Sequence, residues 1–163
     1  MGEVDKYEWI DNGSSFLLAD INAALLYSQL EEAGTIISHR AKRNGLYYNS
    51  LLELGEKGLL KLPSWPDNLV PGSSFFFVET INSEIRKKLI TYLIAKRIQT
   101  VTHYLDLAQS PYIFKYQRSS FSKKNANSIR YQDTILRLPS YYSLEFSQIQ
   151  EITKEINNFY RGN

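Results

Sequence analysis

Cysteine is absent from the 163 residues, and only two histidines occur, His39 and His103, far apart along the chain. Without cysteine the chain can form neither a disulfide framework nor a thiolate metal site. Two distant histidines also lack the close ligand spacing of a histidine-built zinc site. We therefore expect no metal centre.

Long apolar runs and an excess of one charge are lacking as well. No run approaches the roughly 20 apolar residues that a membrane-spanning helix needs, and the N-terminus has no apolar core of a signal peptide. The formal net charge is +2, from 19 basic and 17 acidic residues. Charge therefore gives no argument for a nucleic acid or a membrane as partner, and we expect a cytoplasmic protein.

The composition suits one globular domain, with 43% hydrophobic and 22% charged residues. Tyr7 and Trp9 lie close to the N-terminus, where large aromatic side chains usually pack on something. We read residues 1–16 as an entry arm and residues 17–163 as the domain. The arm packs either on a missing N-terminal partner or on its own domain, and the sequence leaves both options open.

Apolar residues at spacings of three and four predict a long first helix over about residues 17–54. It opens at Ala19 or Asp20 and is expected to break or bend near Gly34 and Gly45. A loop follows it, marked by glycine and proline at Gly55, Gly58, Pro63, Pro66 and Pro71.

Two further helices are predicted. Asn82 or Ser83 can cap one that ends at Lys96 and Arg97, where basic side chains favour the negative end of the helix dipole. The last helix covers about residues 144–160. Its expected buried face carries Phe146, Ile149, Ile152, Ile156 and Phe159 or Tyr160.

Three strands are predicted, at residues 75–81, 100–105 and 135–138. Residues 110–134 read as a long polar loop. The order helix, strand, helix, strand, strand, helix predicts an α/β two-layer sandwich, with a three-stranded, mainly antiparallel sheet and helices on one face.

The segment Gly13-Ser14-Ser15 precedes the first helix, which gives it two interpretations. Backbone N–H groups and serine hydroxyls could bind an anion at the positive end of the helix dipole. Serine at such a place is more often only a helix cap.

His103 and Tyr104 end the second predicted strand, where they could line a site or simply lie at a sheet edge. The loop of residues 112–131 mixes bases and aromatics, which could hold a nucleotide or belong to a solvated loop. No catalytic triad, Walker-type loop or metal motif occurs. Chemistry alone therefore predicts no more than a soluble α/β domain.

Three stretches in register carry a resemblance to one family. They are DNGSSFLLADINAALLYSQL at residues 11–30, THYLDLAQSP at residues 102–111 and LRLPSYYSL at residues 136–144. Together they resemble the C-terminal part of nucleotide-sugar aminotransferases of the DegT/StrS type. The match in order and spacing extends over almost the whole chain.

The resemblance implies the small C-terminal domain of an aspartate-aminotransferase-type (fold type I) enzyme that depends on pyridoxal phosphate. In that family a large N-terminal domain carries the Schiff-base lysine and an aspartate at the pyridine nitrogen. Both are expected to be absent here, so the fragment alone is expected to be inactive and to bind no cofactor. The resemblance also implies that the entry arm, residues 1–16 with Tyr7 and Trp9, packs on the missing N-terminal cofactor domain. The parent enzyme would move an amino group from glutamate to a 4-keto-6-deoxy nucleotide sugar for surface polysaccharide.

The resemblance also implies roles for five residues. Gly13, Ser14 and Ser15 would approach the cofactor phosphate of the neighbouring subunit in a homodimer, and His103 and Tyr104 would lie at the substrate side. No catalytic residue is expected in this chain. The family pattern is broken at Ser74, Asp106 and Ala108.

A rival hypothesis comes from another functional class. The chain could be a non-catalytic interaction or regulatory module, retained after loss of the catalytic half. An upstream reading frame that encodes a cofactor lysine would favour the enzyme.

Overall fold

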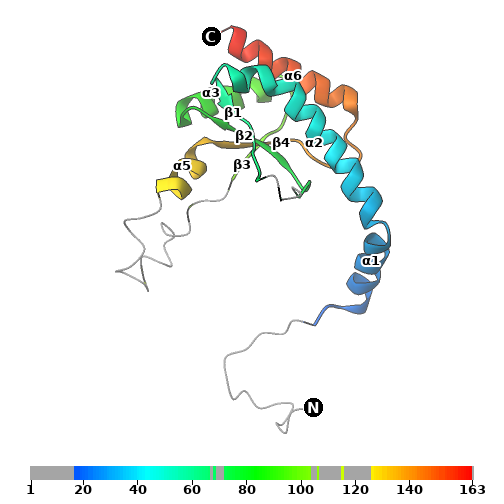
Figure 1. The fold of residues 1–163 in the computed structure, drawn as a ribbon. Helices are drawn as coiled ribbons and strands as arrows, with labels where there is room; N and C mark the ends of the chain where they lie inside the picture. The colour runs from blue at the N-terminus through cyan, green and yellow to red at the C-terminus, as the bar shows by residue number, and fades with distance from the viewer. Residues whose placement is uncertain are drawn as a thin grey trace. The chain divides into compact units, whose positions relative to one another are not determined.

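A computed structural model describes residues 17–66, 68, 72–103, 106, 115 and 126–162. The predicted entry arm, with Gly13, Ser14 and Ser15, lies outside these residues. The elements of the described residues are α1 (Asp20–Glu31), α2 (Ala33–Glu56), β1 (Leu60–Lys61), β2 (Phe76–Thr80), α3 (Ser83–Ala95), β3 (Val101–Thr102), α5 (Ala126–Thr134), β4 (Ile135–Leu138) and α6 (Phe146–Arg161) (Figure 1).

The predicted first helix is two helices. It opens at Asp20 as expected, with Ala19 as N-cap, but the break lies at Glu32 rather than at Gly34. Gly45 lies inside α2 without a break. The chain divides into two compact units, residues 1–34 and 35–163.

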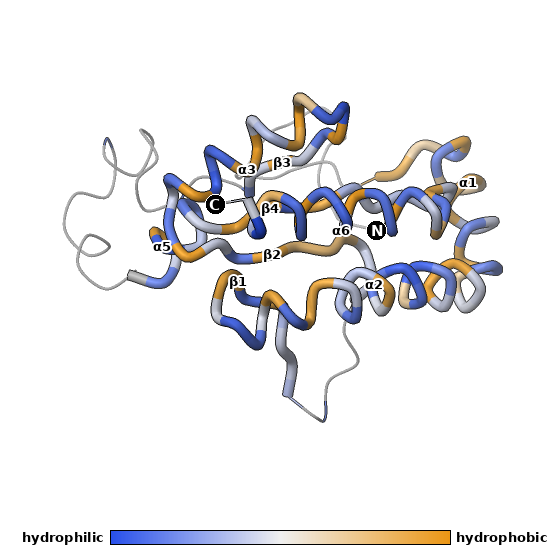
Figure 2. Tube along the Cα trace, turned by 90° about the horizontal axis from the view of Figure 1, so that it is seen from above, coloured by the Kyte–Doolittle hydropathy of each residue, from blue (hydrophilic) through white to orange (hydrophobic). Residues whose placement is uncertain are grey.

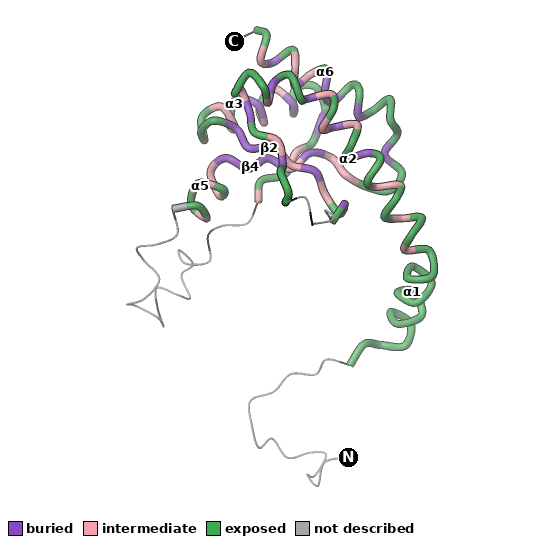
Figure 3. Tube along the Cα trace, viewed as in Figure 1, coloured by how far each residue is buried: buried purple, intermediate pink, exposed green. Residues whose placement is uncertain are grey.

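Helix α1 exposes its apolar side chains. No residue of α1 is buried (Figure 3). Ile21 is 80% exposed, Leu25 60% and Leu30 62%. Because apolar residues point to every side of this helix, it has no polar face to turn to water, which is a pattern typical of a helix surrounded by other elements.

The sheet has four strands in the order β1-β2-β4-β3, and every neighbouring pair is antiparallel. The expected three strands are present, but the count of three was wrong because β1 was read as loop. Gly58, at φ 69°, makes a left-handed turn after α2 that glycine adopts without strain. The chain then enters β1, where Leu60 pairs with Thr80.

The core lies on one face of the sheet. Phe76 and Val78 of β2 point to this face with their register partners Leu138 and Leu136 of β4. Helices α2, α3 and α6 pack there, as Figure 1 shows. The buried side chains that they supply are Tyr47, Leu51, Leu54, Leu89, Leu93, Ile149, Ile152, Ile156 and Phe159.

Helix α6 lies beside α2 along the sheet (Figure 2), and Asn157 Nδ2 donates to the Ser50 carbonyl at 3.3 Å. A capping box at Glu145 and Gln148 begins α6. The predicted buried face is confirmed except at Phe146, which is 48% exposed.

The predicted loop over residues 110–134 was wrong at its end. Residues 126–134 form helix α5, which leads directly into β4. The cap of α3 is confirmed, because the Asn82 side chain accepts from Ile85 N at 2.9 Å.

A buried arginine joins α2 to the segment before α6. Arg43 Nε donates to the Leu144 carbonyl at 2.5 Å, and Nη1 lies 2.6 Å from His39 Nδ1. Since a guanidinium only donates, His39 Nδ1 is the acceptor and the ring is neutral. The His39 ring also lies 4.4 Å from the Tyr142 ring. Desolvation, and then the charges of Arg43 and Lys42, lower the pKa of His39 below its ordinary value.

Candidate functional site

The candidate site is the side of the sheet opposite the core, here called the second face. Side chains alternate along a strand, so the residues between the core positions point to this side. On the three strands β1, β2 and β4 the second face carries Lys61, Phe77, Glu79, Ile135 and Arg137.

Aromatic rings form the middle of the second face. Phe75 lies next to β2, and its ring centre is 6.1 Å from that of Phe77 and 6.2 Å from that of His103. The guanidinium of Arg137 lies over the Phe75 ring, with 4.6 Å from its central carbon to the ring centre. The Phe75 ring therefore lies near both His103 and a cation that the sequence analysis did not select.

A buried carboxylate lies further along the same face. Glu79 is 8% exposed, and its Oε1 accepts from Arg130 Nη1 at 2.8 Å. Thr134 Oγ1 is 3.4 Å from the same oxygen. These contacts compensate the charge of Glu79, as a buried carboxylate requires.

Two hollows open on the second face. One of about 510 Å³ is lined by Phe77, Tyr131 and the Glu79–Arg130 pair, among others. The other, of about 180 Å³, is lined by Phe75 and Arg137 together with Gln99 and Ser140. Basic and aromatic groups in a concave surface can bind a ligand that carries both an anion and a flat ring.

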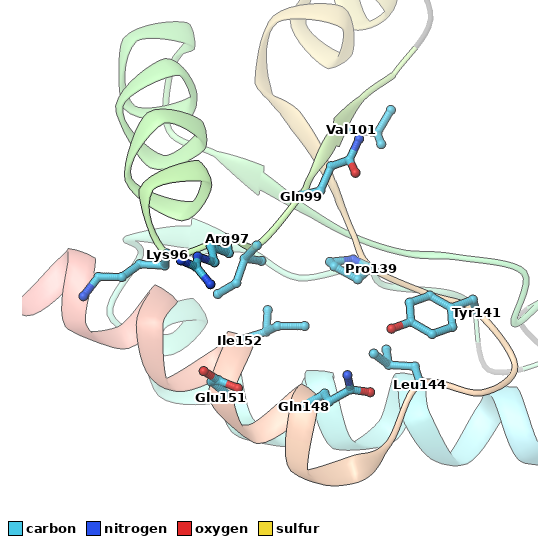
Figure 4. A pocket seen from close by; sticks show the side chains of 11 residues that line it. Lys96, Arg97, Gln99, Val101, Pro139, Tyr141, Leu144, Gln148, Glu151 and Ile152 are labelled. Atoms are coloured by element: carbon cyan, nitrogen blue, oxygen red, sulfur yellow. The ribbon is translucent and has the colours of Figure 1, made fainter.

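A third hollow, of about 710 Å³, lies between the end of α3 and the start of α6 (Figure 4). Lys96, Arg97, Gln148 and Glu151 surround an apolar floor that includes Ile152. Its charges are of both signs, so it does not select an anion or a cation. It shares Gln99, Val101 and Pro139 with the 180 Å³ hollow.

The described residues do not fit a Schiff-base role for pyridoxal phosphate. Such a lysine is usually activated by burial or by a neighbouring cation in an enclosed site, whereas each described lysine is exposed. We therefore assign no step of the cofactor chemistry to this part of the chain. Within the described residues there is also no cluster of three metal-ligating side chains.

The predicted site residues have different outcomes. His103 lies beside Phe75 on the second face. Tyr104 and Gly13, Ser14 and Ser15 lie outside the described residues, so their roles stay predictions. Three residues depart from the pattern of the family that the chain resembles. The structure describes Ser74 and Asp106, whereas Ala108 lies outside the described residues.

The sequence analysis missed Phe75, Glu79 and Arg137, whereas Arg130 belongs to the loop of residues 112–131 that it considered for nucleotide binding. A signal for Arg137 was available, because Leu136 and Leu138 alternate around it in a short strand. A charged residue between two core positions must point to the opposite side of the sheet. Glu79, inside the apolar run of β2, carried the same signal.

No described helix is long and apolar enough to cross a membrane. This finding concerns helices of the described ranges alone.

Comparison with known proteins gives one family and one fold. A model of the DegT/DnrJ/EryC1/StrS aminotransferase family matches residues 1–157. Among solved structures, NtdA from Bacillus subtilis with bound cofactor PMP is similar, with a TM-score of 0.78 and 18% identity over 98% of this chain. DesV from S. venezuelae, solved with a ketimine intermediate, has a TM-score of 0.77 and 23% identity over 95% of this chain.

Helicobacter pylori PseC, an aminotransferase involved in the biosynthesis of pseudoaminic acid, has a TM-score of 0.72 and 17% identity over 99% of this chain. The chain covers 36% of NtdA, 40% of DesV and 43% of PseC. It thus spans less than half the length of these structures.

Proposed function

This chain belongs to the DegT/DnrJ/EryC1/StrS aminotransferase family, and we propose that it forms the small C-terminal domain of a sugar aminotransferase that depends on pyridoxal phosphate. The cofactor lysine would come from the rest of the aminotransferase fold, in the same polypeptide or in another. Bound there, the cofactor would carry the amino group between the two substrates. The work of this chain would be to bind and enclose the substrate.

The observation that carries this proposal is the exposure of α1. Its apolar side chains point to every side, and burying each of the larger ones would contribute roughly 1.5–3 kcal/mol. The matched structures are more than twice as long as this chain. We infer that the part of the fold not represented here surrounds α1.

The second face supports the same function. The cation of Arg137, the ring of Phe75 and the imidazole of His103 lie together there. Once covered by the rest of the fold, a surface of this kind can hold a substrate in position and exclude water from the reaction. The chain would then close the substrate side of a shared active site.

The finer assignments rest on resemblance. Residues 11–30 resemble the corresponding segment of dTDP-4-amino-4,6-dideoxygalactose transaminase. We therefore propose glutamate as amino donor, a 4-keto-6-deoxy nucleotide sugar as acceptor and a cytoplasmic role in surface polysaccharide synthesis. In a homodimer, Gly13, Ser14 and Ser15 would bind the cofactor phosphate of the other subunit, while His103 and Tyr104 would contact the sugar.

Reconstitution tests the proposal. The chain is expressed together with the coding sequence that supplies the cofactor part, as one polypeptide or as two, and the product is assayed for bound cofactor and for amino transfer from glutamate to the nucleotide sugar. We expect a stable, active complex. Leu25→Asp should weaken it by about tenfold or more, because a leucine that is buried in the complex contributes roughly 1.5–3 kcal/mol.

Gln150→Asp is the control, since it adds the same charge to an exposed polar position of α6, outside the helix under test. A complex that tolerates Leu25→Asp as well as Gln150→Asp would contradict the packing of α1. A complex without a cofactor lysine and without amino transfer would support the interaction module instead.

A further inference from the structure

Arg137 is a half-buried cation without an acidic partner among the described residues. The ion pairs in that part of the chain join Lys57 to Glu53, Lys96 to Glu155 and Arg130 to Glu79. A partly desolvated guanidinium without a carboxylate loses hydration. A cation–π contact with the Phe75 ring offsets part of the free energy lost with that hydration.

The hollow beside Arg137 is small and lacks acidic side chains in its lining. Its polar groups are the Arg137 guanidinium, the Gln99 amide and the Ser140 hydroxyl, and each of them can donate a hydrogen bond. A volume of about 180 Å³ is below the range typical of drug-sized ligands, but it exceeds the space that a few waters need. The size and the donors suit a carboxylate or a phosphate group.

The hollows of 510 Å³ and 710 Å³ do not share this character. In the 510 Å³ hollow the cation Arg130 is already paired with Glu79. In the 710 Å³ hollow Glu151 stands among the bases, and Lys96 Nζ lies 3.4 Å from Glu155 Oε2. Of these three hollows, only the one of 180 Å³ has a cation in its lining and no carboxylate beside it.

We infer that Arg137, Gln99 and Ser140 form an oxyanion-binding subsite on the second face, with Phe75 holding the guanidinium plane in position. Arginine is suited to this role because its planar fork can donate two parallel hydrogen bonds to one oxyanion. Two sources share the chemistry: the carboxylate of the amino donor and a phosphate of the sugar substrate. The choice of these sources rests on the proposed function.

Anion titration of the chain tests the subsite. Inorganic phosphate and glutarate are added separately, with chloride at matched ionic strength as reference, while NMR follows the Arg137 side-chain N–H and the Ser140 amide. We expect saturable shifts. Arg137→Met should weaken binding by about tenfold or more, because a hydrogen bond to a charged group contributes roughly 1.5–3 kcal/mol.

Lys88→Met is the matched control, since it removes the same charge from an exposed position on α3 and should leave the affinity within about twofold of the original. Gln99→Ala changes an exposed side chain, does not endanger the core, and should weaken binding severalfold. It keeps the test decisive if Arg137→Met fails to fold.

Saturation by phosphate alone assigns the subsite to the sugar substrate, and saturation by glutarate alone assigns it to the donor. If both saturate, the tighter anion identifies the source. Absence of saturable shifts with either anion, or unchanged affinity in Gln99→Ala and Arg137→Met, overturns the inference. The titration requires no cofactor domain, so its failure is distinct from a failed reconstitution.

Discussion

Replacing Tyr47 by phenylalanine should destabilise the fold in a way that depends on pH. Tyr47 is fully buried, and its hydroxyl donates to the Pro139 carbonyl at 2.9 Å. The variant keeps the ring, which stacks on Phe76 at 5.1 Å between centres and 13° between planes. Only the hydrogen bond is lost, which should cost about 1 kcal/mol at neutral pH and lower Tm by roughly 2–4 °C.

The pH dependence follows from the ionisation of the phenol. Burial, and to a smaller extent the neighbouring Tyr141, raise the pKa of Tyr47 well above its usual range. The folded state therefore keeps the proton after the unfolded chain has lost it. The stability that Tyr47 contributes is fully present below about pH 10, the ordinary pKa of tyrosine, and falls as the pH rises above it.

Urea unfolding of both proteins at neutral and at alkaline pH is the assay. Burial also raises the pKa of Tyr160, to about 12. Tyr160 and the remaining tyrosines are common to both proteins, so the difference between the two free energies of unfolding isolates Tyr47. We expect this difference to shrink above about pH 10.

Tyr27→Phe is the control, because Tyr27 is 65% exposed on α1 and should show no effect at either pH. A Tyr47→Phe variant as stable as the original at neutral pH, or one with the same deficit at every pH, would refute the reasoning.

Four further predictions follow from the contacts and from the resemblance. Arg130→Met should cost about 1–3 kcal/mol by leaving Glu79 buried and unpaired, and adding Glu79→Gln should recover part of that loss in urea unfolding. The lowered pKa of His39 means that the neutral imidazole contributes its full stability above about pH 6.5, and that this contribution falls as the pH drops through the lowered pKa. In urea unfolding, the midpoint of His39→Gln should lack this dependence on acid pH. Pyridoxal phosphate mixed with the chain alone should give no internal aldimine absorbance, and a borohydride-stable adduct at one specific lysine would contradict this. In the reconstituted enzyme Ser15→Ala should weaken cofactor retention by about 1.5–3 kcal/mol in binding free energy, and unchanged retention would remove Ser15 from the site.

The parts of the fold with strong periodicity were predictable. Helix α6 and strands β2 and β4 follow from apolar spacing alone, because local pattern and tertiary burial agree there. Strand β1 has only two residues between a glycine turn and Pro63, too short for any alternation to appear. Helix α5 was hidden by polar composition, since its first residues Ala126 and Asn127 follow a run of polar and basic residues.

The position of the helix break was also beyond the sequence. Glycine at 34 and 45 suggested two bends, yet the chain breaks at Glu32 and passes through both glycines as helix. Intrinsic propensity is a weak prior that neighbouring helical residues easily override.

The candidate site was predictable only in part. His103 was selected from its place at a strand end, and the structure places it beside Phe75. Arg137 belongs to a strand that was predicted correctly, but its place in the site depends on contact with the ring of Phe75, which lies next to another strand. Such a pairing depends on which strands are neighbours, and the sequence did not fix that order.

The apolar surface of α1 has a cost before any complex forms. A newly made chain would expose an apolar helix, and exposed apolar surface of this kind binds chaperones and promotes aggregation. If the rest of the fold is a separate polypeptide, chain that finds no partner would be exposed to proteolysis through this helix. If it is part of the same polypeptide, the helix would be covered as that polypeptide folds.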